Sequence, residues 1–230
     1  MDLCFIIDSS GSIRDNNPAD GSFDNWQLQQ QFLSELVDLF TIGPDATKVG
    51  AVVFSEQVSL VFTLDTYTDA QSVKDAINAI AYLGQTTNTP EGLRVTREQC
   101  FNTANGDRPN VLNLAIFISD GVPFPPERRD PAITEAEALK NSGVTVVAIG
   151  VTNTIDRDLL MQISSPPQEE GQNYFIAADF TALDEIRRAV GEGTCEVIEG
   201  LLDSAPNACS LHRGRHNFLI SGFSFGGKIA

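Results

Sequence analysis

Four stretches of the chain are apolar at nearly every position and rich in β-branched residues. They cover residues 3–7, 48–55, 111–119 and 144–151. Such continuous hydrophobicity is typical of strands covered on both faces, as in a parallel sheet. A fifth stretch, residues 56–64, directly follows the second of these strands. We expect it to pair with that strand as a hairpin at a sheet edge.

The stretches between the strands place apolar side chains at helical spacing, which predicts helices there. These stretches cover residues 26–40, 69–83, 90–101, 133–143, 156–164 and 179–191. Pro90 stands at a favourable first-turn position, and Gly143 stands at a favourable helix C-terminus. Because strands and helices alternate, the sequence predicts an α/β fold with right-handed crossovers.

The alternating pattern stops near residue 193. Residues 194–230 are irregular and Gly-rich, and they contain both histidines of the chain. A length of 230 residues suits one domain of ordinary size with a tail. We therefore expect one domain over residues 1–193 and a linker or partial C-terminal segment over residues 194–230.

The charge balance excludes one class of partner. The chain has 15 basic and 31 acidic side chains, which gives a formal net charge of -16. This balance argues against nucleic-acid binding, because a phosphate backbone requires a basic patch. It is compatible with a secreted protein, a cation-rich setting or a basic partner. No apolar run reaches the roughly 18 residues of a membrane span, and the start does not resemble a signal peptide.

Oxygen-bearing side chains follow two of the predicted strands. Asp8, Ser10 and Ser12 come at alternate positions after the first strand, and Asp120 follows the third. The loop over residues 83–92 adds further hydroxyl groups before a helix. In a doubly wound sheet, ligands bind outside the carboxyl ends of the strands, so these groups are expected at one edge. Hydroxyl and carboxylate oxygens suit Mg²⁺, Mn²⁺ or Ca²⁺ better than zinc.

Three short motifs together carry a family resemblance. "DSSGS", "QTTNTPEGL" and "FISDGVP", in this order and spacing, resemble the metal-ion-dependent adhesion site of von Willebrand factor type A domains. The likeness covers roughly residues 2–192, and the chain resembles the extracellular-matrix branch, such as matrilins, collagen type VI and invertebrate matrix adhesins. It implies a Rossmann-like fold, with a doubly wound, mostly parallel central sheet and helices on both faces. The metal ligands that the resemblance implies are Asp8, Ser10, Ser12, Thr87 and Asp120.

The resemblance also implies a function without catalysis. In this family, a Mg²⁺ ion (or Mn²⁺ or Ca²⁺) accepts an acidic residue of a protein ligand, such as collagen or another matrix protein. Only Asp8 and Asp120 bring negative charge to the ion, so it keeps affinity for a further carboxylate. We expect a secreted adhesion module of the extracellular matrix, without membrane insertion. The alternative is a structural or self-assembling module that contacts collagen or mineral through its acidic surface, with the metal incidental.

Four cysteines, Cys4, Cys100, Cys195 and Cys209, allow three full pairings, which their spacing does not rank. In the fold of the family, the helix after Thr87 packs beside the first strand. The resemblance therefore favours a Cys4–Cys100 disulfide, which would persist only in an oxidising compartment. No CxxC pair is present, so a structural zinc site of the usual spacing is not expected.

Weaker signals remain elsewhere in the chain. Residues 222–226, "GFSFG", match the nucleophile motif G-x-S-x-G, but no histidine follows it, so a hydrolase is not expected. Cys209, His212 and His216 lack a fourth ligand for a transition metal. Asp15 matches one ligand of the regulatory Ca²⁺ site of integrin β-subunit-like domains. Its neighbour in the sequence is an asparagine where those domains have an acid, and we interpret this segment as a solvated acidic loop.

Overall fold

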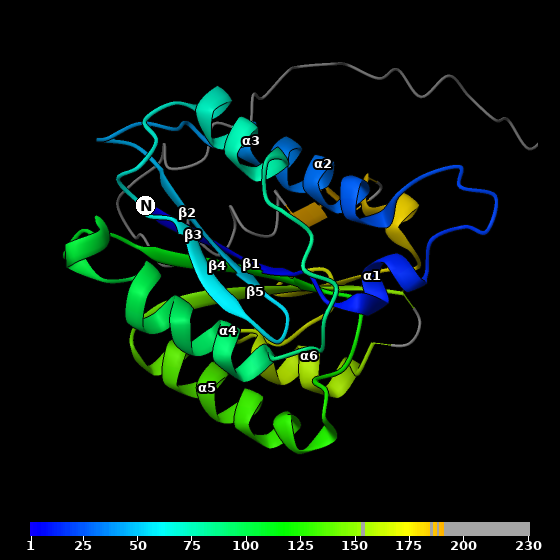
Figure 1. The fold of residues 1–230 in the computed structure, drawn as a ribbon. Coiled ribbons are helices and arrows are strands. Elements are labelled where there is room, and N and C mark those ends of the chain that lie inside the picture. Colours follow the sequence, from blue (N-terminus) through cyan, green and yellow to red (C-terminus); the bar gives the residue numbers. More distant parts are fainter. Residues whose placement is uncertain (153–154, 185, 188, 191–230) are drawn as a thin grey trace, which may run out of the picture.

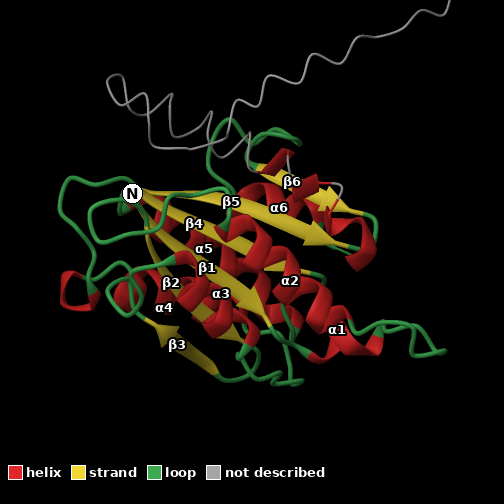
Figure 2. Ribbon diagram, turned by 90° about the horizontal axis from the view of Figure 1, so that it is seen from above, coloured by secondary structure: helices red, strands yellow, loops and turns green. Residues whose placement is uncertain are grey.

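A computed structural model describes residues 1–152, 155–184, 186–187 and 189–190. These residues build one six-stranded sheet in the order β3-β2-β1-β4-β5-β6. The strands are β1 (Asp2–Asp8), β2 (Lys48–Phe54), β3 (Val58–Phe62), β4 (Asn113–Ser119), β5 (Val144–Val151) and β6 (Tyr174–Ala177). Strand β3 is antiparallel to β2, and every other neighbouring pair is parallel. Figure 2 shows β3 and β6 at the two edges, which confirms the predicted mostly parallel sheet with a hairpin at one edge.

Helices cover both faces of this sheet. They are α1 (Gly11–Asp15), α2 (Asn25–Val37), α3 (Ala70–Asn78), α4 (Thr89–Val95), α5 (Arg129–Asn141) and α6 (Arg157–Ile163). In Figure 1, α2 and α3 lie on one side of the strands, and α4, α5 and α6 lie on the other. The predicted doubly wound arrangement is therefore confirmed.

The central strand β1 shows why the strands are apolar throughout. Leu3, Phe5 and Ile7 point into the core that includes residues of α2 and α3. Cys4 and Ile6 point to the opposite face and pack near α4. All five side chains are buried, because side chains alternate between two faces that helices cover.

A disulfide joins Cys4 of β1 to Cys100, with 6.6 Å between the two Cα atoms. Cys100 ends one turn of π-helix, Thr96–Cys100, that continues α4. Gly50 of β2 lies beside Cys4 in the sheet. A Cβ atom at this glycine would approach the Cys100 sulfur to 2.7 Å, so the missing side chain leaves room for the bridge. The pairing favoured by the family resemblance is thus confirmed.

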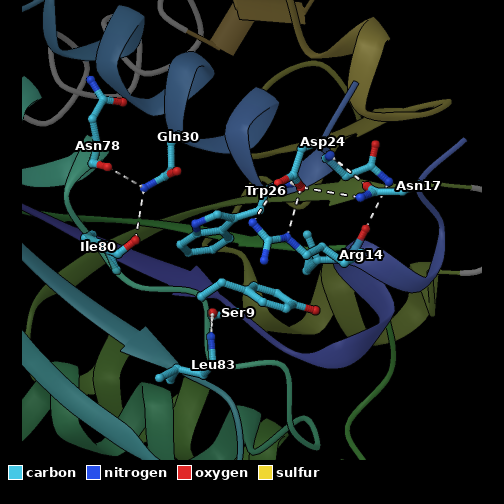
Figure 3. A network of polar contacts seen from close by, with 12 residues as sticks. Ser9, Arg14, Asn17, Asp24, Trp26, Gln30, Asn78, Ile80 and Leu83 are labelled. Carbon is cyan, nitrogen blue, oxygen red and sulfur yellow. Dashed lines mark hydrogen bonds and ion pairs between the residues drawn. The ribbon is translucent and has the colours of Figure 1, made fainter. Parts of the chain in front are cut away.

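Helix α3 is shorter than the sequence predicts, since it ends at Asn78 and not near residue 83. Gln30 of α2 donates its side-chain amide to the carbonyl oxygens of Ile77 (2.9 Å), Asn78 (3.1 Å) and Ile80 (3.2 Å). The last carbonyls of a helix have no partner within the helix, and Gln30 provides one from a neighbouring element. The residues that follow run as a loop, in which the backbone N–H of Leu83 donates to the Ser9 hydroxyl after β1 (Figure 3).

Two short elements, α1 and β6, were not predicted from the pattern, because their apolar runs are too short to show a period. The predicted tail over residues 194–230 lies outside the described residues, together with Cys195, Cys209, the two histidines and residues 222–226. No helix within the described ranges is long and apolar enough to cross a membrane.

Candidate metal centre

The candidate site lies where the sheet topology changes direction. Asp8 is the last residue of β1, and Asp120 follows the last residue of β4, the strand beside it. From β1 the chain continues to β2 on one side, and from β4 it continues to β5 on the other. Such a point opens a crevice at the carboxyl ends of the strands. Both aspartates are buried there.

Hydrogen bonds join the loop after β1 and the loop after β4 into one network. The backbone N–H of Ser10 donates to Asp8 Oδ1 at 2.8 Å. The hydroxyl of Ser12 donates to Asp120 Oδ1 at 2.7 Å, and the Ser10 and Ser12 hydroxyl oxygens lie 3.1 Å apart. The structure thus brings together four of the five predicted ligand residues through direct contacts.

Thr87, the fifth predicted ligand, reaches the same place from the loop before α4. The backbone N–H of Gly11 donates to the carbonyl of Gln85 at 2.8 Å, which aligns this loop with the loop after β1. Thr87 lines an open groove of about 630 Å³ together with Ser12. Its side chain is 6% exposed, yet its hydroxyl makes no hydrogen bond to any other residue that the structure describes. This hydroxyl is therefore available to a ligand in the groove.

The two carboxylates oppose each other electrostatically. Burial, followed by the negative charge of Asp120, raises the pKa of Asp8 to about 7. Burial also raises the pKa of Asp120. No ion pair within the described part of the chain involves either residue. Two buried acids without a basic partner cost free energy of folding. A divalent cation at this site would offset that cost.

The donor set fits a hard cation. Two carboxylates and three hydroxyls supply oxygen only, which suits Mg²⁺, Mn²⁺ or Ca²⁺. No group of three or more His, Cys, Asp or Glu side chains that could hold an ion occurs among the described residues. A cation at this edge would therefore depend on hydroxyls and water besides Asp8 and Asp120. It would keep at least one coordination position for an outside ligand.

Three supporting residues were missed by the sequence interpretation. The hydroxyl of Ser119 donates to Asp8 Oδ2 at 2.6 Å. Asn16 donates its side-chain amide to the Ser12 carbonyl at 2.9 Å and to Asp120 Oδ2 at 3.4 Å. Gln29 of α2 donates to the Asp8 carbonyl at 2.8 Å. Only Ser119 carried a signal, as a polar residue at the end of an apolar strand.

The acidic loop after the first motif has contacts of its own. Asp24 forms an ion pair with Arg14 (2.6 Å) and accepts the backbone N–H of Trp26 (3.1 Å), which caps α2 (Figure 3). Asp20 accepts the backbone N–H of Ser22 at 3.0 Å. Asp24 and Asp20 thus serve the structure of the loop, while Asp15 lines the groove at the candidate site.

The chain is similar in sequence to known proteins. The family model of the von Willebrand factor type A domain matches residues 2–189. Matrilin-2 of Mus musculus is 31% identical over 211 residues, which are 89% of this chain and 20% of that protein. The collagen alpha-6(VI) chain of Homo sapiens is 31% identical over 194 residues, which are 84% of this chain and 8% of that protein. The chain therefore corresponds to a small part of these matrix proteins.

A solved structure supports the same relationship. Proximal thread matrix protein 1 from the mussel byssus, with a zinc-occupied MIDAS motif, is 29% identical in sequence. Its TM-score to this structure is 0.71, and the match covers 84% of this chain and 45% of that one.

Proposed function

Because this chain belongs to the von Willebrand factor type A domain family, we propose that it is a non-enzymatic adhesion module whose binding depends on a divalent cation. The observation that carries the proposal is the buried pair Asp8 and Asp120, which has no basic partner among the described residues and adjoins the groove that Thr87 lines. The relatives matrilin-2 and collagen alpha-6(VI) support a secreted protein of the extracellular matrix. The Cys4–Cys100 disulfide supports an oxidising compartment.

The proposed cation is Mg²⁺, with Mn²⁺ and Ca²⁺ as alternatives. Asp8, Ser10, Ser12, Thr87 and Asp120 would hold it, directly or through water. The bound ion supplies positive charge for an Asp or Glu side chain of a protein ligand, such as collagen or another matrix protein. Zinc belongs in the same tests, because zinc occupies the motif of the mussel relative.

The groove beside the proposed ion has an apolar rim that a protein ligand could contact. Val122 and Phe124 follow Asp120 and are 47% and 55% exposed, and Phe124 lines the groove. The backbone N–H of Phe124 donates to the Thr87 carbonyl at 3.0 Å, which fixes this rim to the loop before α4. We infer that the partner buries these side chains next to its metal-bound acid.

The test of the proposed function is capture from matrix extract by the whole chain, with and without EDTA. Captured protein should disappear with EDTA and return with excess Mg²⁺. Capture that EDTA leaves unchanged would contradict cation-dependent adhesion.

Such a result would favour the second candidate, a structural or self-assembling module that contacts collagen or mineral through its acidic surface. The net charge of -16 favours this candidate. Every Lys and Arg side chain that the structure describes contacts an acid or a backbone carbonyl, which also favours a module that binds through its acidic groups.

Thr87→Ala is expected to weaken Mg²⁺ binding on the order of tenfold, and matrix capture with it. Stability in EDTA should change little, because the Thr87 hydroxyl makes no hydrogen bond within the described residues that the substitution could break. Calorimetric titration and thermal unfolding in EDTA measure the two effects. Thr86→Ala is the matched control, since the Thr86 hydroxyl donates to Glu56. Equal Mg²⁺ affinity in the two variants would remove Thr87 from the ligand set.

Phe124→Ala is expected to weaken matrix capture about tenfold at saturating Mg²⁺, as loss of an exposed aromatic contact does in other interfaces. The affinity for Mg²⁺ alone should stay unchanged, because the side chain supplies no oxygen. Val61→Ala is the control, since Val61 is also exposed but lies on the edge strand β3. A loss of capture as large in the control variant would argue against a specific role of the rim.

A further inference from the structure

Tyr82 connects the loop after β1 to the loop before α4, and both loops contribute residues to the proposed cation site. It lies in the segment between α3 and α4, five residues before Thr87. Its hydroxyl lies 2.9 Å from the carbonyl oxygen of Ser10 and 3.1 Å from that of Gly11, and it donates its one hydrogen between them. A side chain of the loop before α4 thus holds the backbone of the loop after β1.

We propose that Tyr82 is a positioning residue for the divalent cation, because its hydroxyl fixes the Ser10–Gly11–Ser12 backbone from which two ligand hydroxyls extend. This inference rests on the proposed metal site and adds a residue that is not itself a ligand. The Ser10 and Gly11 carbonyls belong to the two peptide groups between Ser10 and Ser12. Their orientation sets where the two serine hydroxyls point.

The position of these hydroxyls decides how well an ion binds. In the structure their oxygens lie 3.1 Å apart, and the Ser12 hydroxyl also reaches Asp120. Mg²⁺ requires its oxygens at short distances in a near-octahedral arrangement, so ligands that are already gathered lose less freedom when it binds. A rotation of either peptide group would separate the two hydroxyls and weaken the site.

The ring of Tyr82 is itself held in place. It packs against Trp26 of α2, with 5.6 Å between ring centroids. The guanidinium carbon of Arg14 lies 4.4 Å from the Tyr82 ring centroid, a distance typical of a cation–π contact. Asp24 binds Arg14 and caps α2, as Figure 3 shows, so this side of the ring is fixed to α1 and α2. The hydroxyl therefore donates from a rigid support.

The backbone around Tyr82 is shaped to accept the ring. Gly84 has a φ of +69°, and a Cβ atom there would lie 2.9 Å from the Tyr82 ring. Directly after Tyr82 in the chain, the backbone N–H groups of Leu83 and Gly84 donate to the Ser9 hydroxyl and carbonyl, both at 2.8 Å. These bonds would persist without the Tyr82 hydroxyl, so its removal changes one contact and leaves the loop attached.

The test compares Tyr82→Phe with Tyr67→Phe in the whole chain. Tyr67 is a matched control, because its ring packs edge-on against Phe62 and its hydroxyl makes no hydrogen bond within the described residues. Calorimetric titration should show a Kd for Mg²⁺ roughly three- to tenfold higher in Y82F, as expected for one lost hydrogen bond. The same ratio is expected for Mn²⁺, measured from the paramagnetic resonance signal of the free ion. Y67F should match the parent.

A purely structural role gives a different result. Y82F would then unfold at a lower temperature in EDTA, while its Kd for Mg²⁺ stayed within twofold of that of Y67F. That outcome would overturn the inference and leave the metal site standing. If the parent chain itself bound neither Mg²⁺ nor Mn²⁺, the proposed metal site and the role of Tyr82 would both be wrong.

Discussion

Replacing Cys4 and Cys100 together by alanine is expected to lower the free energy of unfolding by about 4 kcal/mol. The two residues are 96 positions apart, so the bridge closes a long loop in the unfolded chain and removes much of its conformational entropy. Both cysteines are fully buried, and alanine at these positions introduces no polar group. For a domain of this size, the melting temperature should fall by roughly 10 °C.

Thermal unfolding of the parent and of C4A/C100A, both in EDTA, measures this effect. EDTA removes any contribution of a cation, so the comparison isolates the disulfide. Reduced parent protein should melt close to the double variant. A decrease below about 1 kcal/mol would mean that the bridge is absent in solution or does not restrict the unfolded chain. Peptide mapping of the non-reduced parent would distinguish these two explanations.

Replacing Asp8 by asparagine is expected to abolish stabilisation of the fold by divalent cations. A ligand that binds only the folded state stabilises it by about 2.7 kcal/mol at a hundred times its Kd. Asparagine keeps the shape of the side chain and can still accept the N–H of Ser10 and donate to the Ser119 hydroxyl. It removes half of the negative charge at the site, so the melting shift with Mg²⁺ should vanish.

The same variant also separates the metal from the fold. In EDTA, D8N should be at least as stable as the parent, because it no longer buries a carboxylate beside Asp120 without a cation. The control is Asp69→Asn, which changes an exposed aspartate that caps α3 and lies in none of the loops that form the site. A melting shift with Mg²⁺ as large in D8N as in D69N would exclude Asp8 from the cation site.

The sequence was sufficient for the central strands of the sheet because each of them is buried on both faces. Leu3, Phe5 and Ile7 on one side and Cys4 and Ile6 on the other leave no polar position between the two ends of β1, so the pattern is clear. Strand β6 is short and only partly buried, and a run of four residues carries no measurable period. The end of α3 was also missed, because a contact from Gln30 of α2 determines it and the local pattern does not.

The place of the candidate ligand residues was predictable, and the residues that support them were not. Asp8 and Asp120 stand at the ends of apolar strands, where parallel topology gathers side chains at one edge. Tyr82 gave no such signal, since the apolar pattern placed it inside a helix. Its role depends on a loop path that tertiary contacts create. Residues that orient ligands are set by three-dimensional contacts, and a sequence pattern indicates them only when they lie beside the ligands.

Gly50 and Cys100 occupy one shared space, because the sulfur lies where a side chain of residue 50 would begin. A version of this domain made for a reducing cytosol therefore has an obvious design. When both cysteines are replaced by alanine, the freed volume can accept Gly50→Ala as well. Alanine suits a strand interior better than glycine and would recover roughly 0.5–1 kcal/mol of the lost stability. In the disulfide-bonded chain the same change would be harmful, so the glycine and the bridge should be exchanged together.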